Sequence, residues 1–115
     1  MKFIRILSAL LVLTFSTPSL VSAGELLMFE QDACPWCEAW RREVGVIYDK
    51  TPEGKRAPLV VLDIADPVPE QYSLVYSVRY TPTFVLVENG EEIGRIEGYP
   101  GEDFFWARLE NLLDY

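Results

Sequence analysis

The sequence predicts a small three-layer α/β domain, in which strands joined by helices end in a β-hairpin. Short aliphatic runs alternate with helical patterns along the chain, and an Asn-Gly pair separates the last two runs. The order of the expected elements is β-α-β-α-β-β-α. With 115 residues, of which 50% are hydrophobic, the chain can form one domain with a packed core.

The first 23 residues are typical of a secretory signal peptide. Lys2 and Arg5 form a positive start, residues 6–15 are an apolar stretch, and small residues before Gly24 allow cleavage after Ala23. As a helix this stretch would reach about 15 Å, half of a hydrocarbon core, so an uncleaved anchor is the less favoured alternative. We therefore expect a mature domain of residues 24–115 outside the cytoplasm, where disulfides persist.

Two strands and a long helix are expected in the first half of the mature chain. Residues 26–29 are a short apolar run, and residues 59–64 are an aliphatic run expected of a central strand covered on both faces. A helix begins at Pro35, and residues 51–58 are expected to form a loop. Three- and four-residue spacing places these side chains on one face of the helix: Cys37, Trp40, Val44, Ile47 and Tyr48.

The second half is expected to contain a short helix, a hairpin and a final helix. Residues 70–78 are predicted to be helical, with Tyr72, Val75 and Tyr76 on one side. Residues 83–87 and 91–97 are predicted strands around an Asn89-Gly90 turn, with Ile93 and Ile96 the apolar members of the second. After a break at residues 98–101, the final helix has an apolar face formed by Phe105, Leu109, Leu112 and Leu113.

Charge and composition exclude several classes of function. The formal charge is -8, and it becomes -10 when Lys2 and Arg5 leave with the leader. A chain this acidic repels phosphate backbones, so nucleic-acid binding is not expected. The sequence has no histidine, which excludes Ser-His-Asp and Cys-His catalysis and removes the commonest metal ligand. We expect no metal and no other cofactor.

The two cysteines form a Cys34-Pro35-Trp36-Cys37 motif at a strand-to-helix turn, a context that indicates redox chemistry. Backbone N–H groups at a helix N-terminus stabilise a thiolate, so Cys34 is expected to be the exposed nucleophile. Cys37 lies one turn into the helix and should be shielded. Cys34 would attack a partner disulfide, and Cys37 would resolve the mixed disulfide.

Two other uses of the cysteine pair are less favoured. A structural disulfide closing so short a loop stabilises by only about 2 kcal/mol, which a domain with a sizeable core hardly needs. A zinc site would have only two of its four ligands.

Trp36 either contacts partners or folds against its own helix, and both interpretations remain open. Tyr72, Tyr76, Tyr80 and Tyr99 are expected to pack in the core or at its rim.

Taken together, the cysteine motif, the aliphatic strand, the Thr81-Pro82 pair before a strand, the Asn-Gly hairpin and the glycine before the last helix resemble the thioredoxin superfamily in its minimal form. The motif and the exported leader are most similar to the SoxS-type periplasmic thioredoxin-like proteins of bacterial sulfur-oxidation systems. The resemblance covers residues 25–113. It implies that Pro82 is a cis-proline beside the cysteines, that the backbone of Thr81 pairs with an extended substrate, and that Gly98 borders the same groove. It also implies a redox-active Cys34–Cys37 disulfide.

The resemblance further implies a monomeric periplasmic reductase that keeps the sulfur-carrying cysteine of the SoxYZ carrier reduced. Its electrons would come from a membrane thiol transporter of the SoxV or CcdA type. Reductases of cytochrome c maturation, general disulfide exchange, and a non-enzymatic binding or regulatory module remain alternatives.

The chain departs from cytosolic thioredoxins in the order of residues between the cysteines and in having Met28 where those proteins carry a buried acid. Glu30 is the nearest substitute for that acid. The acidic residues Glu30, Asp32 and Glu38 crowd Cys34 and oppose its thiolate, which predicts a reducing to intermediate redox potential.

Overall fold

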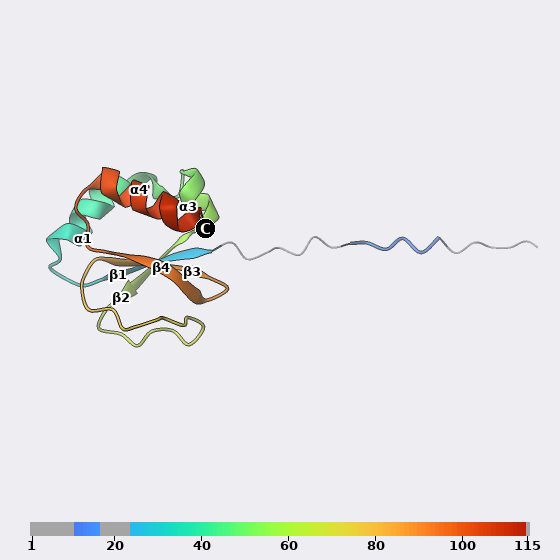
Figure 1. Cartoon of the computed structure of the whole chain (residues 1–115), viewed down its shortest axis with the longest axis horizontal. Helices are drawn as coiled ribbons and strands as arrows, with labels where there is room; N and C mark the ends of the chain where they lie inside the picture. Colours follow the sequence, from blue (N-terminus) through green and yellow to red (C-terminus); the bar gives the residue numbers. More distant parts are fainter. Residues whose placement is uncertain (1–10, 17–23, 115) are drawn as a thin grey trace, which may run out of the picture.

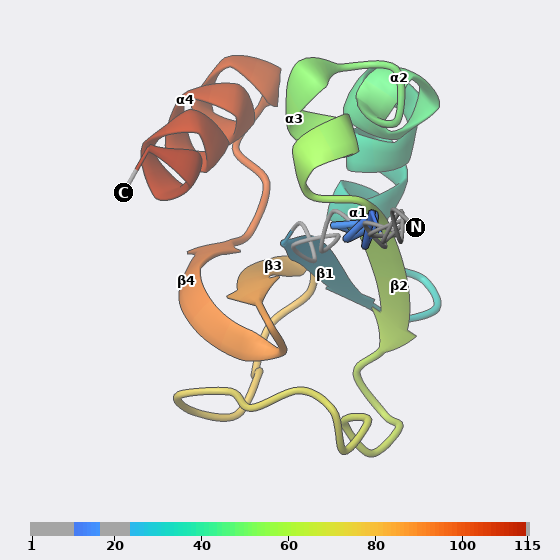
Figure 2. The same ribbon diagram turned by 90° about the vertical axis from the view of Figure 1, so that its right-hand side faces the viewer.

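The structure is a computed structural model that describes residues 11–16 and 24–114. Its elements are β1 (Glu25–Glu30), α1 (Pro35–Trp40), the π-helical turn η1 (Arg41–Gly45), α2 (Val46–Tyr48), α3 (Pro52–Arg56), β2 (Leu59–Asp63), β3 (Thr83–Glu88), β4 (Glu91–Glu97) and α4 (Glu102–Leu113). The sheet has the strand order β2-β1-β3-β4, with β1 and β2 parallel and the other neighbours antiparallel. Helices cover one face of this sheet and an irregular segment crosses the other (Figures 1 and 2). The predicted α/β class is confirmed.

The predicted leader falls largely outside this description. Residues 11–16 have no regular secondary structure, and Leu11 and Phe15 are exposed. The predicted cleavage position after Ala23 lies outside the described residues. Within residues 11–16 and 24–114, no helix is long and apolar enough to cross a membrane.

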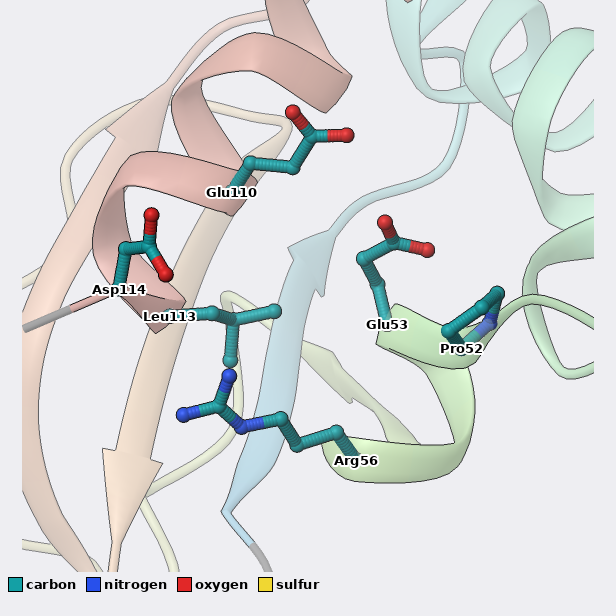
Figure 3. Close-up of a pocket in the computed structure, with 6 residues that line it drawn as sticks. All are labelled: Pro52, Glu53, Arg56, Glu110, Leu113 and Asp114. Carbon is teal, nitrogen blue, oxygen red and sulfur yellow. The ribbon is translucent and has the colours of Figure 1, made fainter.

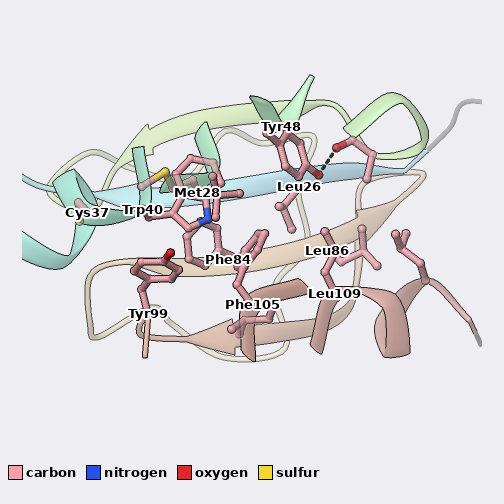
Figure 4. Packing of buried hydrophobic residues seen from close by; sticks show 14 of the residues in the cluster. Leu26, Met28, Cys37, Trp40, Tyr48, Phe84, Leu86, Tyr99, Phe105 and Leu109 are labelled. Carbon is pink, nitrogen blue, oxygen red and sulfur yellow. Dashed lines mark hydrogen bonds between the residues drawn. The ribbon is translucent and has the colours of Figure 1, made fainter. Parts of the chain in front are cut away.

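The main core lies between the helices and the sheet, and five of the fifteen described residues buried in it are aromatic (Figure 4). The ring of Phe105 from α4 lies 4.9 Å from that of Phe84 on β3 and 5.6 Å from that of Trp40 on α1, measured between centroids. Tilted and edge-to-face contacts of this kind add stability beyond the burial of area. These contacts attach the helix that begins with α1, and also α4, to the central strand β3.

The helix after the cysteines is continuous but widens at η1. Beyond Cys37, its buried residues are Trp40, Val44 and Tyr48, which lie four apart in each case, as the wider π turn allows. Ile47 was predicted on the same face and that was wrong, because the turn directs it outward and leaves it 44% exposed.

Two other expectations for this half of the chain were wrong. Residues 51–58 contain the helix α3 rather than only a loop. The Thr51 hydroxyl oxygen caps this helix by accepting a hydrogen bond from Gly54 N–H at 3.0 Å, and Pro52 suits its first turn. The strand of residues 59–63 is an edge strand rather than a central one, and Val61 is half exposed. An aliphatic run does not distinguish the two positions when helices cover one face of an edge strand.

The predicted helix at residues 70–78 is absent, and the third layer is irregular chain. Tyr72, Leu74 and Val78 pack against the second face of the sheet, and the first two follow the two-residue period of an extended chain. The backbone of Ser73 makes a single bridge to the edge of β4. Its N–H donates a hydrogen bond to Gly90 O at 2.8 Å, and its carbonyl oxygen accepts one from Glu92 N–H at 3.0 Å. β-branched and aromatic side chains favour this extended form over a helix.

The hairpin and the final helix were predicted correctly. Asn89 and Gly90 both have positive φ, as a type I′ turn requires. A bulge leaves Ile93 without a partner between the pairs Val87–Glu92 and Leu86–Gly94. This extra residue explains how Ile93 and Ile96, three apart, both pack on the main core. Helix α4 buries Phe105, Leu109 and Leu113, and Leu112 packs partly buried beside them.

Candidate redox site

Strand register brings the predicted site residues to one end of the sheet, which we call the redox end. Here β1, β2 and β4 finish and β3 begins, since Phe29 pairs with Thr83, Glu30 with Asp63, and Thr83 with Glu97. The loop to the cysteines leaves β1 at this end, and the segments that end at Pro82 and begin at Gly98 adjoin it. Residues distant in sequence are therefore gathered here.

Cys34 and Cys37 form a disulfide, with Cα atoms 5.3 Å apart. Cys34 is the N-cap of α1, and its Sγ accepts a hydrogen bond from the backbone N–H of Cys37 at 3.2 Å. A helix begins here because Pro35 has no N–H to satisfy in the first turn and Cys34 adopts an extended backbone. The first sulfur therefore lies where backbone N–H groups favour a negative charge.

The exposure of Cys34 is smaller than predicted. Cys34 is 5% exposed and Cys37 is fully buried, so the order is right but the expectation of an exposed nucleophile was wrong. Both cysteines belong to the main core cluster, because the chain leaves β1 through a tight turn at Asp32-Ala33, where Ala33 has φ 54°. Trp36 between them is 63% exposed, which decides against its folding onto its own helix.

The Thr81–Pro82 peptide bond is cis, as the resemblance implies. Pro82 is buried and Thr81 is half-buried. Gly98 donates its N–H to Pro82 O at 2.8 Å, so these two residues are in direct contact. Gly98 has φ 82°, a conformation that favours glycine. The structure thus joins Pro82 and Gly98 and sets them at the same end as the cysteines.

The acidic residues near Cys34 are less alike than the sequence indicated. The Glu30 carboxylate forms an ion pair with Arg41, so its charge is neutralised, whereas Asp32 and Glu38 are exposed and have no ion-pair partner among the described residues. Met28 is fully buried beside the cysteines in the core cluster. The predicted crowding of negative charge therefore rests on Asp32 and Glu38.

Sequence reasoning placed Tyr99 only among core or rim tyrosines and missed its contact with the cysteine helix. Tyr99 is 5% exposed, belongs to the cluster that contains both cysteines, and donates to Glu43 Oε2 at 3.1 Å. Burial, together with the Glu43 carboxylate, raises the pKa of Tyr99 to about 12. Of the other predicted packing tyrosines, Tyr72 is partly buried, whereas Tyr76 and Tyr80 are exposed, contrary to expectation.

Arg95 was also missed. Its guanidinium donates to both carboxylate oxygens of Glu92, at 2.9 and 2.6 Å, and lies 3.8 Å over the ring of Tyr76. Burial alone would raise the pKa of Glu92, but hydrogen bonds from Arg95 and Val75 N–H lower it. Residues three apart on a regular strand face opposite sides, so only the bulge at Ile93 could have revealed this pair.

The described residues contain no group of three His, Cys, Asp or Glu side chains placed to hold a metal ion. What the arrangement can do chemically is exchange one disulfide for another. It offers a vicinal cysteine pair, a helix N-terminus at the first sulfur, and an adjoining backbone edge at Thr81.

Comparison with known proteins agrees with this chemistry. The family model of the thioredoxin-like domain matches residues 22–113. The crystal structure of the periplasmic thioredoxin SoxS from Paracoccus pantotrophus, in reduced form, is 47% identical, with a TM-score of 0.78, and the match covers 79% of this chain and 96% of that one.

More distant structures share the fold alone. A thioredoxin of Malassezia sympodialis is 22% identical, with a TM-score of 0.54 over 77% of this chain and 74% of its own. A thioredoxin from Thermus thermophilus is 21% identical, with a TM-score of 0.53 over 78% and 73%. A search of curated proteins found no match.

Proposed function

Because this chain belongs to the thioredoxin-like domain family and is a thiol–disulfide oxidoreductase with the Cys34–Cys37 pair, we propose that it acts as a reductase of protein disulfides in the periplasm. The observation that carries the proposal is the hydrogen bond from Cys37 N–H to Cys34 Sγ. It supports the role of Cys34 as the sulfur whose thiolate is stabilised, and Cys34 is also the less buried of the two.

In the proposed reaction the reduced protein supplies two electrons and two protons. The Cys34 thiolate attacks one sulfur of the substrate disulfide, which breaks the substrate S–S bond and forms a mixed disulfide. The other substrate sulfur leaves as a thiolate and takes up a proton. The Cys37 thiolate then attacks Cys34 Sγ, which closes the Cys34–Cys37 disulfide and releases the second substrate thiol. A dithiol donor must reduce the protein again.

Four further residues are proposed to bind the substrate. Trp36 offers an exposed ring between the cysteines, and the backbone of Thr81 would pair with an extended substrate segment. Pro82 and Gly98 would border the same groove, a role that their mutual hydrogen bond supports. This arrangement would hold the substrate sulfur in line with Cys34.

The likeness to SoxS supports a narrower role. We propose that the client is the sulfur-carrying cysteine of a SoxYZ-type carrier, that a membrane thiol transporter of the SoxV or CcdA type supplies electrons, and that the protein works as a monomer. Export requires the leader, so the mature protein would begin at Gly24. N-terminal sequencing of the exported protein would test that boundary.

Trapping of the mixed disulfide tests the reaction. Cys37→Ser removes the resolving thiol, so a client should remain covalently bound to Cys34 and be released by dithiothreitol. Mass spectrometry would identify the client and the linked cysteine. Cys34→Ser is the matched control and should trap nothing. Equal trapping by both variants would contradict the assigned roles, and failure of the unmodified protein to reduce insulin would refute the reductase.

A further inference from the structure

Exposed aromatic side chains gather at the redox end, around the proposed substrate groove. Tyr80, immediately before Thr81, is 62% exposed, and Trp36 and Tyr76 are also exposed. Tyr76 and Tyr80 line a cavity of about 370 Å³ together with Ser77, Arg79 and Glu97. Large rings open to solvent beside a reactive centre provide contact area for a partner.

Exposed carboxylates surround these rings. Asp32 follows β1, Asp66 follows β2, and Glu97 ends β4, so strand register sets all three at the redox end. Asp32, Asp66 and Glu38, the last in the first turn of α1, have no ion-pair partner among the described residues. Their charges are therefore available to a partner, whereas Glu97 is paired with Arg95 at 4.0 Å and accepts a hydrogen bond from the Tyr76 hydroxyl at 2.9 Å.

Positive charge is scarce at this end. Arg41 is paired with Glu30, which leaves Arg79 at the cavity, and Arg42 one turn beyond Glu38 on the cysteine helix, as unpaired cations among the described residues. The exposed cations of Lys50, Lys55 and Arg56 precede β2 and lie toward the opposite end of the sheet. The redox end is therefore negative, whereas the opposite end carries both signs of charge.

We propose that this surface, formed by Trp36, Tyr76, Tyr80, Asp32, Glu38 and Asp66, docks a protein segment in which lysine or arginine flanks the reacting disulfide. Carboxylates around a groove raise the encounter rate with a cationic partner. Exposed aromatic faces also bind cationic side chains, as the ring of Tyr76 does with Arg95 at 3.8 Å. This inference rests on the proposed reductase activity and specifies its substrate class.

Two disulfide peptides that differ only in their flanking residues test the proposal. One carries lysines beside the disulfide and the other glutamates, and the second-order rate constant for reduction by the reduced protein is measured at several salt concentrations. The basic peptide should react about tenfold faster at low salt, and the ratio should approach one at about 1 M salt, where the Debye length is about 3 Å.

Charge-removing variants locate the effect. Asp32→Asn with Asp66→Asn should slow reduction of the basic peptide at least threefold, and Arg79→Gln should accelerate it. The matched control is Glu110→Gln with Asp114→Asn, which makes the same change in net charge at a separate cavity between α3 and α4 (Figure 3). That control should leave the rate within about twofold. Reduction of the neutral hydroxyethyl disulfide reports the change in Cys34 itself that loss of the Asp32 charge causes, so each peptide rate is compared as a ratio to the rate with this neutral disulfide.

The outcomes distinguish this proposal from the one on which it rests. Equal rates for the two peptides, or equal effects of the two double variants, would overturn the docking surface while leaving the reductase intact. No reduction of either peptide would refute the reductase, and the docking proposal with it.

Discussion

At the scale of single residues, buried tyrosine hydroxyls make stability depend on pH. Tyr99 has its pKa raised to about 12, mainly by burial, and burial also raises the pKa of Tyr48. An unfolded tyrosine ionises near pH 10, so the unfolded chain gains charge first. Stability is therefore fully present below pH 10 and is lost as pH rises from about 10 to about 12.

Tyr99→Phe should reduce this alkaline loss, because it removes one of the two hydroxyls. The difference should be on the order of 2 kcal/mol between pH 9 and pH 12. Urea unfolding followed by tryptophan fluorescence across this range would measure it. Tyr80→Phe, at an exposed position, is the control. If Tyr99→Phe loses as much stability at alkaline pH as the unmodified protein, the Tyr99 hydroxyl is not the cause of the loss.

Glu92 gives the corresponding prediction in acid. Its pKa is lowered, so its contribution is present above about pH 4.5 and is lost as pH falls through the lower value of the folded state. Glu92→Gln leaves the Arg95 side chain, which is 6% exposed, without its carboxylate, and should cost about 3 kcal/mol at pH 7. Urea unfolding at pH 7 and pH 3 would measure the loss, which should be smaller at pH 3. Glu91→Gln, an exposed neighbour, should change little.

At the scale of elements, the short helix α3 depends on close contact with the end of α2. A Cβ at Gly54 would lie 1.8 Å from Tyr48 O, a backbone atom that cannot move aside. Gly54→Ala should therefore cost about 2 kcal/mol or more, and lower the melting temperature by roughly 10 °C, despite the better helix propensity of alanine.

Gly45→Ala provides the matched comparison in calorimetry. Its Cβ would meet side-chain atoms rather than backbone, the Trp40 ring at 3.1 Å and Arg41 Cβ at 3.7 Å, so the change in stability should stay within about 1 kcal/mol. A Gly54→Ala protein as stable as the Gly45→Ala protein would show that α3 can move away from α2.

The same scale shows what the sequence could and could not predict. The hairpin, the final helix and the cysteine helix depend on local signals, Asn89-Gly90, apolar periodicity and Pro35, and these were predicted correctly. The position of β2 at the edge and the extended course of residues 70–78 depend on which surfaces the neighbouring chain covers. Periodicity in a short segment does not contain that information.

The site divides in the same way. The cysteine pair and the N-terminal position of Cys34 follow from the motif, and the Thr81–Pro82 cis bond follows from the family resemblance. The near burial of Cys34 and the Glu30–Arg41 ion pair result from how the loop after β1 folds back onto the core. Side-chain partners across a loop cannot be derived from spacing along one segment.

At the scale of the whole molecule, one aromatic cluster holds the layers together. Phe105 is fully buried, and its ring contacts those of Trp40, Phe84 and Tyr99. Phe105→Ala should cost about 3–5 kcal/mol, a large part of the total stability of a domain this size. Chemical denaturation of the oxidised protein would measure it. Phe104→Ala, on the adjacent half-exposed side chain, should cost less than about 1 kcal/mol, and similar losses in both would contradict the cluster's role.

The bulge in β4 has a consequence for the length of the chain. Ile93 is the one member of this strand that faces no residue of β3, while its neighbours Glu92 and Gly94 keep theirs. Removal of this single position would leave every other cross-strand match as it is and take away only one apolar side chain. A one-residue deletion should therefore be tolerated at Ile93, whereas a deletion in the part of the strand after it would exchange the inward and outward sides of everything that follows.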